Sequence, residues 1–305
     1  MLEKMCQNTN KGIFLALIAA ALYAISSPIS KLMLGYLPPV LMAGFLYIGA
    51  GVGMSAVAIV RRKNGDSERS ESFTRADAPY ILAMIALDIA APIFLLIGLS
   101  KSTAASVSLL NNFEIVATAM IALVLFGEKI SKRLWLGIAL VTASCALLSF
   151  EDISSLDFSL GSLFVLFACI CWGVENNCTR RLSSKDPVVI VILKGFFSGL
   201  GSLVIGFLRG ERVLYVWSVL AVLAVGFVAY GLSIFFYVRA QRTLGAARTS
   251  AYYAVSPFIG ALLSLLIFRD ALYYIYFIAL ALMILGAYLC SSDEPIFKSK
   301  SPLKK

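Results

Sequence analysis

Ten apolar runs, each close to 20 residues long, follow one another along the chain with short polar connections between them. A run of about 20 apolar residues is long enough to cross the hydrocarbon core of a bilayer as an α-helix. Backbone N–H and C=O groups find no water there, so each crossing segment must satisfy them internally. The sequence therefore predicts an all-α polytopic membrane protein with ten transmembrane helices, at residues 12–34, 38–60, 78–100, 103–126, 133–150, 158–182, 187–208, 214–238, 244–268 and 271–290.

The composition agrees with a membrane protein. Of the 305 residues 60% are hydrophobic and 14% are charged, and the mean hydropathy is +0.89. A water-soluble domain of this size does not carry so much apolar surface. The connections between the runs are short, which leaves no room for a separate soluble domain, and residues 291–305 form a basic tail.

The net charge of +9 has two possible explanations, nucleic-acid binding and membrane topology. With the N-terminus in the cytoplasm, the inside segments hold 20 of the 26 Lys and Arg residues, the outside segments hold 5, and Lys194 lies inside a run. An excess of basic residues on one side is the mark of cytoplasmic connections. We expect a multi-pass protein of the plasma or inner membrane with both termini cytoplasmic, in contact with the lipid bilayer and with no nucleic-acid partner.

Enzyme chemistry finds little support in the residue types. Histidine is absent from the chain, which removes Ser-His and Cys-His nucleophile pairs and HExxH metal sites. The six cysteines lack metal-ligand spacing, and no GxxxxGK[ST] phosphate-binding loop occurs. We therefore predict no catalytic residue, no metal and no cofactor.

The fourth run carries a polar stripe on one helical face. Ser108, Asn111, Glu114 and Thr118 are separated by steps of three, three and four residues, so an α-helix places them on the same side. An ionisable group at mid-bilayer costs at least about 3 kcal/mol, so this face must meet protein or a water-filled cavity. Glu114 is the leading candidate for binding a proton or a cation; the alternative is a buried glutamate paired with a neighbouring helix for stability.

The two halves of the chain carry the same pattern. Residues 12–31 align without a gap over residues 161–180, and the second helix of each half opens with Pro-Val, at Pro39 and at Pro187. An offset of 142 positions then places the polar stripe over Ser250, Tyr253, Ser256 and Gly260. Five helices is an odd number, so the second half must insert upside down. We predict two inverted five-helix repeats, residues 11–150 and 158–290, with a solute site at their interface near the midplane.

Three further ionisable residues lie inside predicted helices. Asp88 comes four residues before Pro92, which leaves a backbone carbonyl free near the carboxylate; Asp88 either binds a proton or cation, or pairs with Lys194. Glu175 shares a face with Trp172 near the predicted cytoplasmic end of its helix, and either takes part in gating or binding or extends to the membrane surface. Lys194 either neutralises a carboxylate or receives the carboxylate of an amino-acid-like solute.

The charge balance of these groups constrains the solute. If all four are ionised, Asp88, Glu114 and Glu175 against Lys194 leave the interior at about −2, which favours amines, zwitterions, cations or protons. Seven aromatic residues are candidates for lining a mostly apolar pocket with a few polar groups, namely Tyr23, Tyr47, Trp172, Tyr230, Tyr237, Tyr252 and Tyr253. Tyr253 is the strongest because it falls opposite Asn111 in the repeat register, whereas the others are expected to face lipid or pack at the membrane interface instead.

Several of these features together mark a known family. They are Tyr23-Ala24 and Trp172-Gly173, the Pro-Val openings, Lys194 seven residues after Pro187, Glu114 with Gly127-Glu128, and Ser256-Pro257 with Asp270. With them the chain resembles the EamA-type transporters of the drug/metabolite transporter superfamily over about residues 11–290. The chain departs from the family pattern at Ile115, where a proline is usual, and at Arg269-Asp270, where Gly-Glu is usual. The resemblance implies two inverted EamA repeats that move small metabolites, commonly amino acids or their relatives.

The sequence thus predicts a secondary active transporter of an amino-acid-like, amine or other amphipathic solute, working by alternating access through a central cavity and coupled to protons at Glu114 or Asp88. Two other classes stay open, an intramembrane enzyme and a non-transporting scaffold or sensor, and the protein is expected to be a monomer or a dimer. The predicted solute-binding residues are Tyr23, Ser108, Asn111, Glu114, Trp172, Glu175, Lys194, Ser250 and Tyr253.

Overall fold

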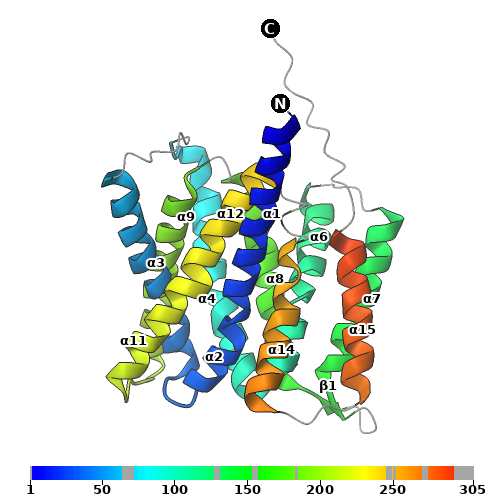
Figure 1. The fold of residues 1–305 in the computed structure, drawn as a ribbon. Helices are drawn as coiled ribbons and strands as arrows, with labels where there is room; N and C mark the ends of the chain where they lie inside the picture. Colours follow the sequence, from blue (N-terminus) through cyan, green and yellow to red (C-terminus); the bar gives the residue numbers. More distant parts are fainter. Residues whose placement is uncertain are drawn as a thin grey trace.

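The structure, a computed structural model, describes residues 2–63, 72–126, 131–152, 157–182, 185–244, 249, 252–269 and 274–291. Figure 1 shows a bundle of helices that lie side by side. Ser250, Gly127, Glu128 and Asp270, which the sequence analysis singled out, lie outside the described residues.

The first half begins with a helix in two pieces and continues through four further apolar segments. Its helices are α1 (Leu2–Ala24), α2 (Ser26–Met33), α3 (Pro39–Lys63), the short 3-10 helix η1 (Arg75–Asp77), α4 (Ala78–Lys101), α5 (Ala104–Leu110), α6 (Phe113–Phe126) and α7 (Lys132–Ser149).

The second half contains two π-helical turns within longer helices. Its helices are α8 (Leu160–Arg181), α9 (Pro187–Leu193), the π-helix η2 (Lys194–Ser198), α10 (Gly199–Leu208), α11 (Val216–Val225), the π-helix η3 (Gly226–Leu232), α12 (Ser233–Leu244), α14 (Ser256–Phe268) and α15 (Tyr274–Ser291).

Most of these helices are long enough to cross a bilayer. Within the described residues eight helical segments are both long and apolar enough, and two more apolar helices, Ser256–Phe268 and Tyr274–Cys290, are shorter than 18 residues. These two occupy the positions of the ninth and tenth predicted spans. The predicted all-helical membrane fold is confirmed in this coarser form, while the count of ten stays a prediction.

A short pair of strands joins the halves, and the sequence analysis did not predict it. Strands β1 (Phe150–Asp152) and β2 (Asp157–Phe158) pair antiparallel, with Phe150 opposite Phe158. They take up residues that the apolar runs 133–150 and 158–182 had placed at helix ends. Helix ends fray easily, so a run of apolar residues does not by itself say where the helix stops.

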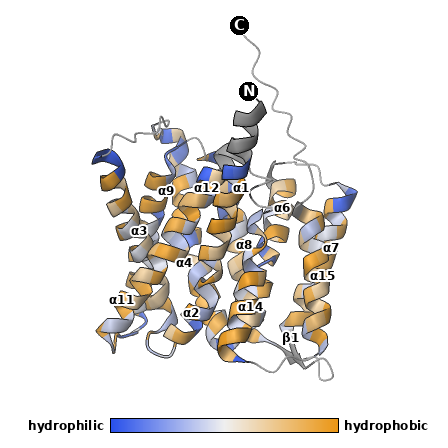
Figure 2. Ribbon diagram, in the orientation of Figure 1, coloured by the Kyte–Doolittle hydropathy of each residue, from blue (hydrophilic) through white to orange (hydrophobic). Residues whose placement is uncertain are grey.

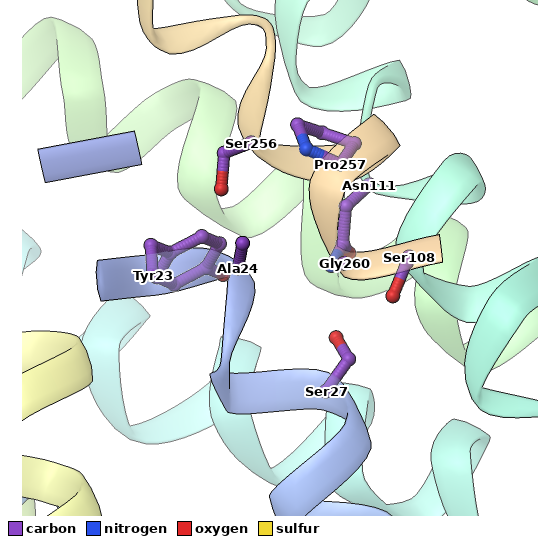
Figure 3. A pocket seen from close by; sticks show the side chains of 8 residues that line it. All are labelled: Tyr23, Ala24, Ser27, Ser108, Asn111, Ser256, Pro257 and Gly260. Carbon is purple, nitrogen blue, oxygen red and sulfur yellow. The ribbon is translucent and has the colours of Figure 1, made fainter. Parts of the chain in front are cut away.

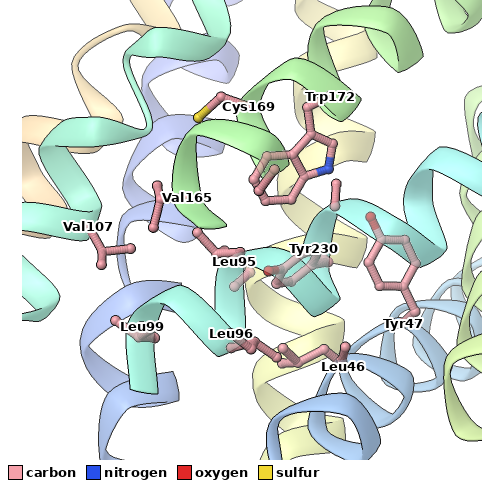
Figure 4. Close-up of a cluster of buried hydrophobic side chains, with 14 of the residues drawn as sticks. Leu46, Tyr47, Leu95, Leu96, Leu99, Val107, Val165, Cys169, Trp172 and Tyr230 are labelled. Carbon is pink, nitrogen blue, oxygen red and sulfur yellow. The ribbon is translucent and has the colours of Figure 1, made fainter. Parts of the chain in front are cut away.

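Apolar residues predominate along the helices, and hydrophilic residues gather at several helix ends (Figure 2). Large exposed side chains include Leu82, Val124, Leu208, Leu220 and Leu266. The interior is closely packed around Leu95, Leu96, Leu99, Val165, Trp172 and their neighbours (Figure 4). This arrangement suits a protein surrounded by lipid, since burial of apolar side chains brings little gain there and helices associate through packing and polar contacts.

Several helices are interrupted, and two of the breaks lie at comparable places in the two halves. α1 gives way to α2 at Ile25, and α5 gives way to α6 at a turn of Asn111 and Asn112. α14 begins directly after a turn at Ala254 and Val255. The offset of 142 places the turn of Asn111 and Asn112 over residues 253 and 254, one residue away. The prediction of one uninterrupted helix over 103–126 was therefore wrong.

The break at Asn111 has a local cause. Asn side chains compete with the helix for backbone hydrogen bonds, and here the Asn112 side-chain amide donates to the carbonyl oxygen of Leu109 over 3.3 Å. Asn112 is 1% exposed, so this bond forms away from solvent. Two consecutive asparagines in an apolar run were the sequence signal for the break.

Both π-helical turns pack against α3, where glycines let the backbones meet. A Cβ on Gly226 would lie 2.0 Å from the carbonyl oxygen of Leu46, and one on Gly49 would lie 2.1 Å from the carbonyl oxygen of Leu223. Neither distance is compatible with any side chain. Small residues at such crossings allow the close helix contacts found in membrane bundles.

Contacts between helices recur when the two halves of the chain are exchanged, and we call this the exchange pattern. α3 and α7 each pack on their counterpart in the second half, α10 and α15, and the fourth segment packs through α5 on α14 of the ninth segment. The remaining contacts come in exchanged pairs: α1 packs on α12 while α4 packs on α8, and α6 packs on α8 while α1 packs on α14. Such a pattern is what a two-fold relation between two halves of five helices produces.

Candidate functional site: a polar centre between the two halves

Three ionisable side chains form a buried cluster that joins α4, α8 and η2. The Lys194 Nζ atom lies 2.5 Å from Glu175 Oε1 and 3.2 Å from Asp88 Oδ2. All three residues are at most 4% exposed. Asp88 Oδ2 has no hydrogen-bond partner, so its contact with Lys194 is an ion pair rather than a well-oriented hydrogen bond. One ammonium group thus serves two carboxylates, and we call these residues the ionic triad.

Neighbouring hydroxyl groups hold the two acids of the triad. The Tyr47 hydroxyl on α3 donates to Asp88 Oδ1 over 2.8 Å, and the Thr179 hydroxyl donates to Glu175 Oε1. Burial of a charge is tolerated only where partners replace water, and these donors provide that replacement. Of the alternatives left open by the sequence, the geometry matches a Lys194 that neutralises carboxylates, with Asp88 as one of its partners.

Glu114 lies apart from the triad, in the first turn of α6. The Asn176 side-chain amide on α8 donates to Glu114 Oε1 over 2.6 Å, and Thr118 Oγ1 lies 3.4 Å from the same nitrogen. A carboxylate in the first helical turn also benefits from the positive end of the helix dipole. Within the described part of the chain, Glu114 forms no ion pair. The side chain is half-buried and meets protein, as the polar stripe required.

Asn176 is a residue that the sequence analysis missed. The signal was present as two amides after Glu175 inside an apolar run. Asn177 also has a structural task, because its side-chain amide donates to the carbonyl oxygens of Gly173, 2.8 Å away, and Thr118, 3.2 Å away. These bonds tie α8 to α6 beside Glu114.

Five tyrosines form a continuous chain of ring contacts across the interface of the halves. Tyr47 contacts Tyr230 with ring centroids 5.4 Å apart, and Tyr230 contacts Tyr23 at 5.8 Å. Tyr23 then contacts Tyr253 at 5.9 Å, and Tyr253 contacts Tyr237 at 4.8 Å. Tyr23 and Tyr253 are also near enough to Glu114 to interact with its charge. The chain therefore links the ionic triad, through Tyr47, to the surroundings of Glu114.

A small cavity lies where the interrupted helices meet (Figure 3). Its volume of about 10 Å³ is enough for roughly one water molecule. The lining comes from the junction of α1 and α2, the end of α5 and the start of α14, namely Tyr23, Ala24, Ser27, Ser108, Asn111, Ser256, Pro257 and Gly260. The breaks in these helices thus place backbone and hydroxyl groups around one space, which is tolerated within a membrane only where protein or a cavity surrounds them.

The structure brings most of the predicted residues together, in three groups. Tyr23, Ser108 and Asn111 line the cavity, Tyr253 contacts Tyr23, and Glu114 contacts Asn176. Asp88, Glu175 and Lys194 form the ionic triad. Trp172 is 7% exposed and packs in the hydrophobic cluster with Cys169 and Tyr230 rather than on the cavity (Figure 4). Their roles in binding stay predictions.

Comparison with known proteins gives the family. The model of the EamA-like transporter family matches residues 10–150 and again residues 159–292. The chain belongs to this family. An uncharacterized transporter of Methanothermobacter thermautotrophicus is 25% identical over 292 residues, covering 91% of this chain and 85% of the relative. The inner membrane transporter YedA of Escherichia coli K12 is 22% identical over 274 residues, covering 86% and 85%.

A solved crystal structure has a similar fold. Its TM-score is 0.65 at 18% sequence identity, and the match covers 93% of this chain and 95% of the other. As an EamA-like transporter, the protein is a multi-pass membrane transporter, and the expected membrane fold and transporter class are confirmed at this level.

Proposed function

We propose that the protein is a secondary active transporter that carries a small solute with a positively charged amine through the centre of the bundle by alternating access. The observation that carries this proposal is the polar centre itself. Three acids, one base and five tyrosines from both halves gather inside a bundle whose outer surface is apolar. Ionisable groups inside a membrane are expensive and serve solute or ion pathways by default.

The architecture that supports this function is a pair of inverted repeats of five helices, ten in all, with both termini in the cytoplasm and the protein in the plasma or inner membrane. The exchange pattern of helix contacts supports the repeat, as does the matching position of the helix breaks before α6 and α14. Transporters of this design bind solute at the interface of the repeats, near the bilayer midplane.

The chemistry of the centre favours a cation over an anion. Lys194 is held by Asp88 and Glu175, so it does not offer its charge to the carboxylate of a solute in this conformation. Glu114 has only a neutral amide donor among the described residues, and Tyr23 and Tyr253 lie near it. A carboxylate with adjacent tyrosine rings suits an ammonium group, because aromatic faces attract cations. Glu114 takes either the amine or a proton, which makes the two exchange.

The cavity at the helix breaks is too small for an organic solute. Small-molecule sites typically occupy about 300–1,000 Å³, far more than one water molecule. Entry of a solute therefore requires the helices around the centre to move apart on one side. The interrupted helices supply places where such a movement needs little rearrangement of regular hydrogen bonds.

The test is solute flux in liposomes that contain the purified protein. A screen of amines, amino acids and other amphipathic solutes under a pH gradient should give uptake above that of empty liposomes for an amine-bearing compound. Glu114→Gln should abolish this pH-driven flux, because an amide binds neither a proton nor an ammonium charge, while Glu114→Asp should retain part of it. Absence of flux for every solute in the screen, or wild-type flux at every pH for Glu114→Gln, contradicts the proposal.

A further inference from the structure

The cavity between the broken helices collects oxygen atoms that lack partners. The hydroxyl oxygens of Ser108 and Ser256 have no hydrogen-bond partner, although the two residues are only 2% and 1% exposed. Both residues line the cavity (Figure 3). An unpaired buried hydroxyl costs about 1–3 kcal/mol, so two of them on one small space indicate an occupant.

A third oxygen at the cavity, the backbone carbonyl of Ala24, also lacks its helical hydrogen-bond partner. The α-helical partner of the Ala24 carbonyl would be the N–H of residue 28, which is a proline and has none. Ala24 therefore presents its carbonyl oxygen without that bond, at the end of α1. The C-terminal end of a helix carries partial negative charge, which favours a cation.

Gly260 on α14 leaves the space open. The point where its Cβ would stand lies 3.1 Å from the Ala24 carbonyl oxygen and 3.1 Å from Ser108 Oγ. Two oxygens from different helices thus face one point that the missing side chain leaves vacant. Ser27 and Asn111 add a hydroxyl and an amide group to the same wall.

The chemistry of the lining selects the class of occupant. None of the eight lining residues is acidic or basic. Oxygen ligands suit hard cations, whereas Ca²⁺ and Mg²⁺ sites use carboxylates to balance their charge. A space of about one water molecule excludes an organic solute in this conformation. Glu114 lies in the first turn of α6, three residues after Asn111, and its charge raises the local preference for a cation.

From this geometry we infer that the cavity is a binding site for one dehydrated monovalent cation of the size of Na⁺, held by oxygens of Ala24, Ser27, Ser108, Asn111 and Ser256. The role of this ion as a coupling ion rests on the proposed transport function, whereas its binding does not. Ser108 and Asn111, predicted from the sequence to contact solute, then serve the ion. Unwound backbone carbonyls at helix breaks hold Na⁺ in transporters by the same principle.

The test is thermal unfolding of the purified protein in detergent with equal concentrations of sodium, potassium or choline chloride. Binding to the native state stabilises it by an amount that grows with the logarithm of the ligand concentration above Kd, so Na⁺ should raise the unfolding temperature and choline should not. Ser108→Ala should weaken the apparent Na⁺ affinity by about tenfold, since one ligand is lost. Gly260→Ala should remove the response, because its methyl group fills the space.

Ser202→Ala is the matched control. Ser202 on α10 is equally buried and its hydroxyl is equally unpaired, but it does not line the cavity. It should keep the full Na⁺ response. Equal stabilisation of the wild type by sodium and choline would show that the cavity holds only water and would overturn the inference, as would an unchanged response in Gly260→Ala.

Flux measurements keep this inference separate from the proposed function. Amine flux that is indifferent to Na⁺, together with no Na⁺-dependent stabilisation, refutes the ion site alone. Na⁺-dependent stabilisation without any solute flux refutes the transport function and leaves the site in place.

Discussion

Replacement of Lys194 by methionine tests the ionic triad most directly. The ammonium group contacts both Asp88 and Glu175, and all three residues are at most 4% exposed. Removal of one partner of a buried ion pair costs about 3–5 kcal/mol, because the remaining charge is left without compensation. Here two carboxylates lose the same partner, so we expect a loss near the upper limit, about 5 kcal/mol. That corresponds to a change of more than about 10³-fold in the ratio of folded to unfolded protein.

The neutral triple variant separates charge from packing. In Asp88→Asn, Glu175→Gln, Lys194→Met no charge remains, and the carbonyl oxygens of the new amides can still accept from Tyr47 and Thr179. Replacement of a whole buried ion cluster by well-packed hydrophobic groups of similar volume is often neutral or stabilising, and here the two amides keep their hydroxyl donors. The triple variant should therefore recover most of the stability that Lys194→Met loses.

The assay is thermal unfolding followed by a thiol-reactive fluorophore. Cys145 and Cys169 are buried in the folded protein and become reactive when it opens. Lys101→Met, a change of an exposed lysine at the end of α4, serves as the control and should stay within about 0.5 kcal/mol of the wild type. The reasoning fails if Lys194→Met is as stable as the wild type, or if the triple variant is no more stable than the single one.

Two further changes probe the packing of α3. Gly49→Ala should destabilise the protein by at least about 3 kcal/mol or prevent folding, because its Cβ would stand 2.1 Å from the Leu223 carbonyl oxygen. Gly35→Ala is the control, because its Cβ would meet nothing closer than 3.5 Å. Equal unfolding temperatures for the two variants would contradict the prediction. Glu211→Gln should cost about 1 kcal/mol in the same assay, because Glu211 Oε2 accepts from the Leu41 N–H in the first turn of α3 over 2.8 Å. An unchanged unfolding temperature would show that this cap is unimportant.

The sequence predicted the membrane fold because apolar length is a direct consequence of bilayer thickness. It also predicted that Glu114 meets protein, since the cost of a charge in lipid leaves no other choice. The repeat register was informative as well: the offset that aligned Asn111 with Tyr253 places the two helix breaks within one residue of each other. In each case one physical term dominates all others.

What the sequence could not supply depends on which side chains meet. The sequence did not show which of the three acids pairs with Lys194, because spacing along the chain gives no distances between helices. A π-helical turn begins at Lys194, and no residue pattern predicted it. Asn176 was overlooked because its importance comes from Glu114 on another helix, 2.6 Å away. The unpaired hydroxyls of the cavity became visible only once the helices were assembled.

The exchanged contacts of the two halves describe what the opposite-facing state should look like. At present the first helix bends at Ile25, whereas α8, its counterpart, runs straight through Val174, the residue aligned with it. If the two halves exchange conformations as solute crosses, the bend would move from Ile25 to Val174. Glu175 is the next residue, so the kink would swing its carboxylate away from Lys194 and reopen the charge of that lysine. Under the proposed alternating access, the same two positions would then shape both the inward-facing and the outward-facing state.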